Sequence, residues 1–147
     1  SVFAYIIVFN CVTLYQFENN ELNNYTGTFG FQRFSGGKRS NPYYLFVLDN
    51  GDMVSVLCKN VDYQEELSEF SELTFVYSRM TSPGRFPWVY DCLSIVSPDG
   101  DVVVDIEDSI DRCRGGLKTT LIILCVCICL SVTAHVFYRF IKKKYKL

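Results

Sequence analysis

Histidine and proline are scarce in this 147-residue sequence, and their scarcity excludes two classes of protein. The single histidine, His135, lies inside an uncharged run, so it cannot pair with a nucleophile and an acid in the polar part of the chain. We therefore expect no enzyme and no catalytic residues. The four prolines accompany 49% hydrophobic and 16% aromatic residues, a composition that excludes a disordered chain.

The C-x-x-C spacing of a zinc site is also absent, although the sequence has seven cysteines. Cys125, Cys127 and Cys129 are spaced two apart, and residues two apart on a helix point in different directions. The acidic run from Asp99 to Asp111 lacks the ligand spacing of a calcium loop. We expect neither a metal nor a cofactor.

Three cysteines lie in the central part of the chain, Cys58, Cys92 and Cys113. In an oxidising compartment Cys58 and Cys92 could pair across neighbouring strands, which would leave Cys113 free or bonded to another chain. The odd number of cysteines favours a reducing compartment instead, so the disulfide state stays open.

Acidic residues are absent after Asp111, and all 16 of them lie between Glu18 and that position. Only six basic residues fall in the same interval, whereas the other eight lie at or beyond Arg112. An acidic domain repels phosphate backbones, which excludes nucleic acid as a partner. The basic C-terminal segment favours the anionic surface of a cytoplasmic leaflet.

Formal charge is absent from residues 119–138, TTLIILCVCICLSVTAHVFY. A helix rises about 1.5 Å per residue, so this run is about 30 Å long and matches the hydrocarbon core of a bilayer. Basic residues follow it directly. The pattern predicts a transmembrane helix over residues 117–141, with residues 142–147 as a basic cytoplasmic tail.

Residues 1–17 form the other uncharged run. A signal peptide would have a basic start and a small-residue cleavage site, which this run lacks, and a buried core element is the other alternative. We predict a first transmembrane helix with Tyr15 and Phe17 at the membrane interface. Both termini would then lie on one side of the membrane and the domain, residues 18–116, on the other.

Small and polar residues predict how the two helices pack. Cys127, Ser131 and Ala134 fall close to one helical face, and small residues permit close approach of helices in a bilayer. With the helices antiparallel, Asn10 is expected to lie at the depth of Ser131 and to face it.

The central residues alternate in hydropathy, which is typical of short strands. Asn50-Gly51 predicts a hairpin turn, and Asp62 begins a capping-box pattern before a short helix from Tyr63 to about Phe70. The expected strands are residues 26–34, 42–48, 53–58, 73–80, 88–97 and 102–106.

Three strands, a helix and then further strands is the order of an OB-like barrel. The alternatives are an SH3-like barrel and a small open sheet with the helix laid across it. We therefore expect an integral membrane protein with a β-rich α+β domain between two transmembrane helices.

Two aromatic and basic loops, residues 33–44 and 79–88, are the candidate interaction surface, because Arg, Tyr and Trp are enriched at binding hot spots. Alternatively, the aromatic residues of the second loop cap the core or touch the membrane interface. The candidate interaction residues are Arg33, Lys38, Arg39, Tyr43, Arg79, Arg85, Phe86 and Trp88.

Basic residues near the ends of the C-terminal run indicate its orientation. Five follow it, Arg139, Lys142, Lys143, Lys144 and Lys146, and three precede it, Arg112, Arg114 and Lys118. The larger number after the run favours a cytoplasmic C-terminus and an extracytoplasmic domain.

We expect a non-enzymatic, membrane-anchored protein-interaction module, either an accessory subunit of a membrane complex or an immunity or exclusion factor. Its expected location is the bacterial inner membrane, and its partners are the lipid bilayer and another membrane or extracytoplasmic protein. The alternative is a viral or cell-surface envelope protein that engages a host partner. Glycosylation at Asn24, in an Asn-Tyr-Thr acceptor, or an intermolecular disulfide at Cys113 would favour this alternative.

Overall fold

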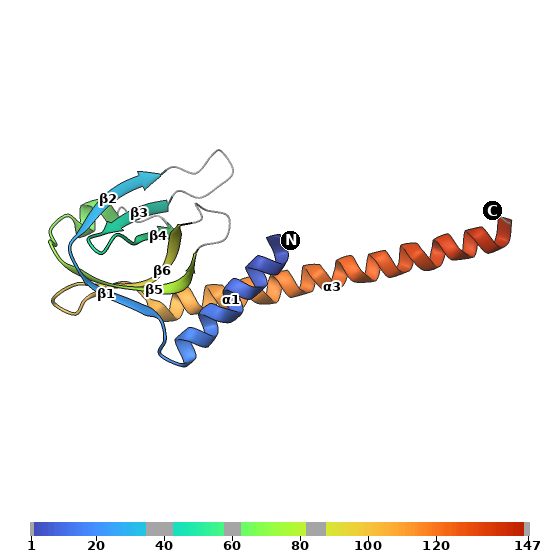
Figure 1. Cartoon of the computed structure of the whole chain (residues 1–147), viewed down its shortest axis with the longest axis horizontal. Coiled ribbons are helices and arrows are strands. Elements are labelled where there is room, and N and C mark those ends of the chain that lie inside the picture. The colour runs from blue at the N-terminus through green and yellow to red at the C-terminus, as the bar shows by residue number, and fades with distance from the viewer. Residues whose placement is uncertain (1, 35–42, 58–62, 82–87, 146–147) are drawn as a thin grey trace.

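A curled β half-barrel with a short N-terminal helix and a long C-terminal helix makes up the protein (Figure 1). The computed structural model describes residues 2–34, 43–57, 63–81 and 88–145. The strands are β1 (Asn23–Gly27), β2 (Phe29–Phe34), β3 (Tyr43–Leu48), β4 (Met53–Leu57), β5 (Leu73–Thr81), β6 (Val89–Val96) and β7 (Val102–Val104). The helices are α1 (Val2–Glu18), α2 (Tyr63–Leu67) and α3 (Ile106–Tyr145).

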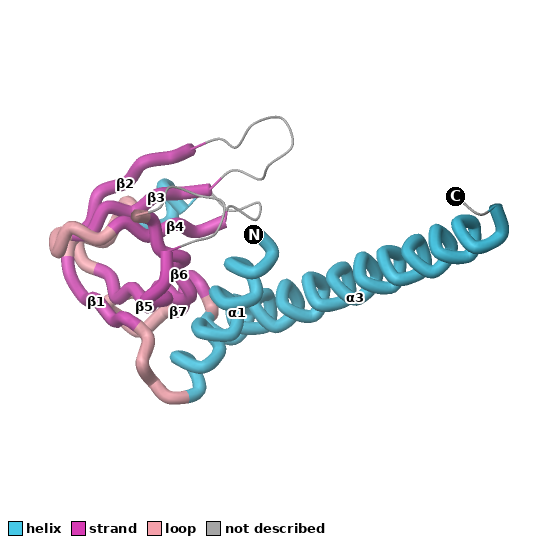
Figure 2. Tube along the Cα trace, turned by 45° about the vertical axis from the view of Figure 1, so that its right-hand side comes forward, coloured by secondary structure: helices cyan, strands magenta, loops and turns pink. Residues whose placement is uncertain are grey.

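The sheet has the order β1-β5-β6-β4-β3-β2, and β7 pairs with β6 outside this path. β4 and β6 run parallel, whereas the other pairs are antiparallel. The single strand predicted over residues 26–34 is divided at Thr28 into β1 and β2. These two strands follow each other in the chain but lie at opposite ends of the sheet order, so the sheet curls round on itself (Figure 2).

Aromatic side chains fill the inside of this curled sheet. Phe46 and Phe75 are fully buried, and their ring centroids lie 5.3 Å apart. Phe29 packs edge-on against both, at 6.0 Å from Phe46 and 5.6 Å from Phe75. Leu67 of α2 is also fully buried and belongs to the same core. The β-rich domain predicted from alternating hydropathy is therefore present, with α2 contributing to its core.

The hairpin predicted at Asn50-Gly51 is confirmed. Gly51 has a φ of 90°, and Asp52 donates its backbone N–H to the Asn50 side-chain oxygen at 2.9 Å. Only a residue without a Cβ adopts such a positive φ readily, which is why glycine occupies this turn.

α3 begins at Ile106, well before residue 117, where the sequence pattern predicted its start. Asp105 caps it, because its carboxylate accepts the backbone N–H of Glu107 at 2.9 Å. The extra turns are stabilised by packing on β6, where Ser109 and Ile110 are buried. Beyond the domain, α3 runs free of the sheet to its end (Figure 1).

Within the described residues, α3 is the one helix that is long and apolar enough to cross a membrane. α1 is apolar as well, but it has only 17 residues. It lies beside the first part of α3 and against β5.

Candidate functional site

α1 buries three polar side chains and exposes several apolar ones, unlike the usual helix on a water-soluble protein. Its buried residues are Phe9, Asn10, Thr13 and Gln16, and three of the four are polar. They recur at helical spacing and so share one face. That face is turned toward β5 and α3.

Hydrogen bonds join this buried face to the sheet. The hydroxyl oxygens of Thr13 and Ser78 lie 3.0 Å apart, and Arg79 donates its backbone N–H to Gln16 Oε1 at 3.1 Å. The Tyr5 hydroxyl donates to the backbone carbonyl of Thr81 at 3.0 Å, so the N-terminal half of α1 is held against β5 as well. We call the group Asn10, Thr13, Gln16 and Ser78 the polar seam.

All four side chains of the polar seam are buried and hydrogen-bonded. Asn10 donates its side-chain N–H to the carbonyl of Ile6 at 3.0 Å, and Ser78 Oγ accepts the backbone N–H of Met80 at 3.2 Å. A buried polar group without a partner would cost about 1–3 kcal/mol. The seam therefore fixes the rotation of α1 about its axis, because turning the helix would break the bonds of Thr13 to Ser78 and of Gln16 to the Arg79 backbone.

Asn10 lies against Gly116 of α3, where a Cβ would meet its side-chain nitrogen at 3.6 Å. The prediction that Asn10 faces Ser131 is wrong. Ser131 is exposed, and its hydroxyl donates to the carbonyl of Cys127 at 2.8 Å. Gly116 and Ser131 are about 22 Å apart along a helix that rises 1.5 Å per residue. α1 stays beside the start of α3 because β5 holds it there.

Ala134, like Cys127 and Ser131, is exposed on the free part of α3. These three residues do not contribute to the contact between α1 and α3, in which Gly116 meets Asn10. Their predicted role in packing against another helix stays a prediction.

The opposite face of α1 carries Ala4, Val8, Cys11 and Tyr15, which recur at i, i+4, i+7 and i+11. All four are exposed, with Val8 at 49% and Tyr15 at 58%. We call these four residues the outer face of α1.

The predicted interaction residues fall partly within the described chain. Arg79 and Trp88 are exposed and flank the connection between β5 and β6. Tyr43 begins β3, opposite Phe34 of β2, and is half-buried. Lys38, Arg39, Arg85, Phe86 and the side chain of Arg33 lie outside the described residues.

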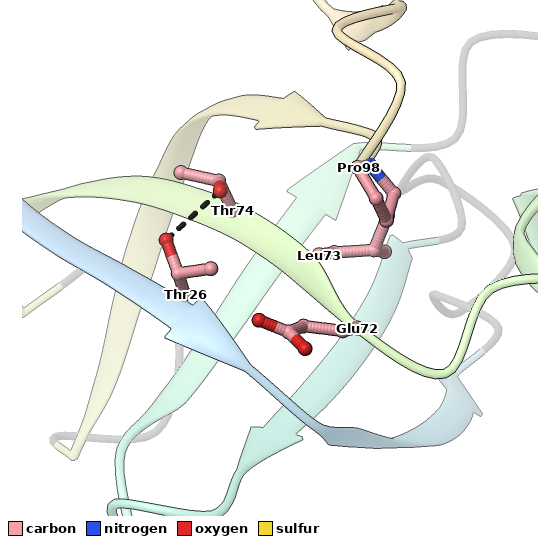
Figure 3. Close-up of a pocket in the computed structure, with 5 residues that line it drawn as sticks. All are labelled: Thr26, Glu72, Leu73, Thr74 and Pro98. Carbon is pink, nitrogen blue, oxygen red and sulfur yellow. Dashed lines mark hydrogen bonds between the residues drawn. The ribbon is translucent and has the colours of Figure 1, made fainter.

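A shallow hollow lies at the edge of β1 and β5, between Thr26, Glu72, Leu73, Thr74 and Pro98 (Figure 3). Its volume is about 40 Å³, far below the roughly 300–1,000 Å³ of small-molecule sites. The hydroxyl oxygens of Thr26 and Thr74 lie 2.9 Å apart and bond to each other. The hollow is therefore too small for a substrate or cofactor of ordinary size.

A polar cluster that the sequence pattern did not predict joins the β3–β4 hairpin to β5. The Tyr77 hydroxyl donates to the Asp52 carboxylate and accepts a hydrogen bond from Asn50 Nδ2 at 3.4 Å. Tyr90 packs against the Tyr77 ring, with centroids 5.6 Å apart. Burial, followed by the hydrogen bond to Asp52, raises the pKa of Tyr77 to about 12.

This pKa predicts a loss of stability at high pH. The folded state holds the Tyr77 proton more tightly than the unfolded chain, whose tyrosine pKa is about 10. The stabilisation is therefore complete well below pH 10, and it falls as the pH rises from 10 to about 12, by at most about 1.4 kcal/mol per pH unit. Tyr77→Phe should lack this part of the fall when urea unfolding in detergent is followed across that range.

Tyr145→Phe is the matched control for this measurement, because Tyr145 is 64% exposed and lies beyond the uncharged run of α3. It should unfold with the pH profile of the unmodified chain. An unchanged profile for Tyr77→Phe would contradict the assignment of the slope to Tyr77.

Cysteines of the domain do not form a reactive centre in the described residues. Cys92 is a free, buried thiol that donates to the carbonyl of Ser94 at 3.3 Å, and burial raises its pKa. Burial also raises the pKa of Cys113 to about 11. Both thiols are thus protonated near neutral pH, when a thiol is a poor nucleophile. Cys58 lies outside the described residues.

The described ranges contain no group of three or more His, Cys, Asp or Glu side chains that could hold a metal ion. Comparisons with protein-family models, curated proteins and solved structures found no match. The features that inform function are therefore the two helices and the polar seam that joins α1 to the sheet. The polar seam has one signal in the sequence, the helical spacing of Asn10, Thr13 and Gln16 within an apolar run.

Proposed function

We propose that this protein is a non-enzymatic, membrane-anchored module that binds another protein through its β domain. The observation that carries the anchor is the surface of α3. From Leu121 to Phe140 every side chain is exposed, and the run contains a single formal charge, at Arg139. In water so large an apolar surface would cost about 25 cal/mol per Å², whereas lipid solvates it.

Residues 1–17 were predicted from the sequence to cross the membrane as well. A helix of 17 residues is about 26 Å long, at the lower limit for a crossing. A second crossing would require α1 to leave β5 and break the bonds of Thr13 and Gln16 to the sheet. We therefore propose a single crossing by α3.

The domain is proposed to be an OB-like barrel. If β1 and β2 count as one strand broken at Thr28, the barrel has five strands, and that first strand pairs with both the second and the fourth. The parallel pair of β4 and β6 and the position of α2 between β4 and β5 support this assignment. β7 is then an addition to the edge of β6.

In an OB barrel the loops after the first and fourth strands contribute to ligand binding. Here these are the β2–β3 and β5–β6 connections, the same two regions that the aromatic and basic composition indicated. Arg79 and Trp88, exposed beside the second of them, are the proposed contact residues. The acidic charge of the domain favours a protein over nucleic acid at this surface.

A photocrosslinking residue at Trp88 tests this surface in intact membranes. We expect it to form a crosslink with one membrane or extracytoplasmic protein. The same residue at Asp101, exposed in the turn beyond the other end of β6, is the control and should form none. Equal crosslinking from both positions, or from neither, would contradict a partner site at the β5–β6 connection.

The proposed location is the bacterial inner membrane, with the domain extracytoplasmic and the C-terminus cytoplasmic. Five basic residues after the span against three before it support this orientation. Asp101→Cys places an exposed thiol in a domain turn. An impermeant maleimide should label it in cells with a permeable outer layer and an intact inner membrane, and labelling only after lysis would reverse the orientation.

A second candidate function, an envelope protein that engages a host partner, is favoured by one observation. Asn24 is exposed on β1 within the Asn-Tyr-Thr acceptor sequence. An exposed acceptor in the secretory pathway would carry a glycan, so a shift in electrophoretic mobility that Asn24→Gln removes would favour this candidate.

A further inference from the structure

The outer face of α1 has the chemistry of a lipid-facing surface. Ala4, Val8, Cys11 and Tyr15 are exposed, and α1 carries no charge before Glu18. The polar side chains that could make the helix soluble are instead bonded inside the polar seam. The exposed surface of α1 is therefore apolar, because its polar side chains form hydrogen bonds inside the fold.

The contacts of α1 place it at one level along α3. Asn10 lies against Gly116, and Thr120 is the last buried residue of α3. Thr120 is also at the beginning of the uncharged run, residues 119–138. Figures 1 and 2 agree that α1 lies beside the domain end of α3 and that the rest of α3 extends away from it. α1 thus reaches the start of the proposed span and does not accompany it further.

We infer that α1 is a membrane-interface helix whose outer face rests among the acyl chains of the leaflet next to the domain. This inference rests on the proposed function, because it requires α3 to cross the bilayer. The occupant is lipid because the outer face is apolar and uncharged, and α1 lies beside the level of α3 at which the exposed apolar surface proposed to face lipid begins. An interfacial helix lies about 5–10 Å into the boundary of headgroups and acyl chains, the level at which Thr120 begins the span.

The polar seam explains how a helix whose only charged residue is Glu18, at its end, can stay at this level. Lysines and arginines usually hold the polar side of an interfacial helix in water. In α1 the sheet has that role, because Tyr5, Thr13 and Gln16 bond to β5 along most of its length. The domain is thereby held close to the membrane surface, with α3 crossing the bilayer and α1 lying at its interface.

Fluorescence quenching by brominated lipids tests this inference on the full chain. The only tryptophan is replaced by Trp88→Phe, and one reporter is introduced on the outer face, Val8→Trp. The protein is reconstituted in phosphatidylcholine vesicles with bromines near the headgroup end or near the methyl end of the acyl chain. We expect the shallow bromines to quench Val8→Trp about twofold more than the deep ones, because of the shallow position of an interfacial helix.

Two further reporters make each outcome decisive. Ile128→Trp, at the middle of the proposed span, should be quenched most by the deep bromines, and Ala4→Trp should repeat the shallow profile of Val8→Trp. Val8 lies near the middle of α1, so strongest quenching by the deep bromines would mean that α1 crosses the bilayer, which overturns the inference.

If neither set of bromines quenches Val8→Trp or Ala4→Trp while Ile128→Trp is quenched, the outer face lies outside the bilayer, in water or against a second copy of the chain. That result also overturns the inference but leaves the α3 anchor intact. If Ile128→Trp itself is not quenched, the proposed anchor fails.

Discussion

Lysine in place of both Ile128 and Leu130 is expected to release the full chain from the membrane. Both side chains lie near the middle of the uncharged run and are more than half exposed, at 54% and 65%. A lysine at the centre of a membrane helix costs about 2.5–3.5 kcal/mol, so two cost about 5–7 kcal/mol. That cost lowers the equilibrium constant for membrane insertion by about four to five factors of ten. The fraction that resists extraction by alkaline carbonate should fall from nearly all to nearly none.

Val102→Lys is the control for the double substitution. Val102 is also exposed, at 61%, but it belongs to β7 in the domain, where a charge meets water. This variant should stay in the membrane fraction. If the double variant resisted extraction as well, α3 would not be the anchor, and its apolar surface would have to be covered by protein.

Phe46→Ala is expected to destabilise the domain more than any exposed substitution. The Phe46 side chain is fully buried and packs against Phe29, Phe31 and Phe75. Deleting a buried phenylalanine ring costs about 3–5 kcal/mol because the cavity closes only in part. The free energy of unfolding of a domain is typically about 5–15 kcal/mol, so Phe46→Ala would remove a large part of it.

Urea unfolding of the detergent-solubilised chain, followed by far-UV circular dichroism, measures this effect. Val102→Ala is the matched control and should change the free energy of unfolding by about 0.5 kcal/mol or less, because Val102 is exposed. A loss below about 1 kcal/mol for Phe46→Ala would contradict a core built around the aromatic cluster.

Local patterns predicted those elements whose structure depends on neighbours in the sequence. The hairpin at Asn50-Gly51 was predicted because a tight hairpin turn needs a positive φ, which Gly51 adopts readily. The short helix after Asp62 was predicted by its capping pattern, but α2 ends at Leu67, before the predicted end near Phe70. The start of α3 was missed because the charges of residues 107–114 concealed a helix that packing on β6 stabilises.

The candidate site was less predictable, since it depends on contacts between distant segments. The sequence pattern singled out Asn10 but assigned it Ser131 as its partner, on the assumption that two spanning helices run side by side. In the folded chain Thr13 meets Ser78 and Asn10 meets Gly116, residues that only the curl of the sheet brings to α1. Arg79 and Trp88 are exposed, as expected for contact residues, and their binding role stays a prediction.

By itself the amino-acid order determined that residues 119–138 form an apolar rod and that an acidic, strand-rich segment precedes it. Hydropathy and charge are properties of each residue and add up along a helix, so no distant contact was needed to read them. Only the tertiary structure decided which face of α1 turns inward. The inward face is set by its contacts with Ser78, the backbone of Arg79 and Gly116. A buried polar side chain is stable only where folding brings it a hydrogen-bond partner.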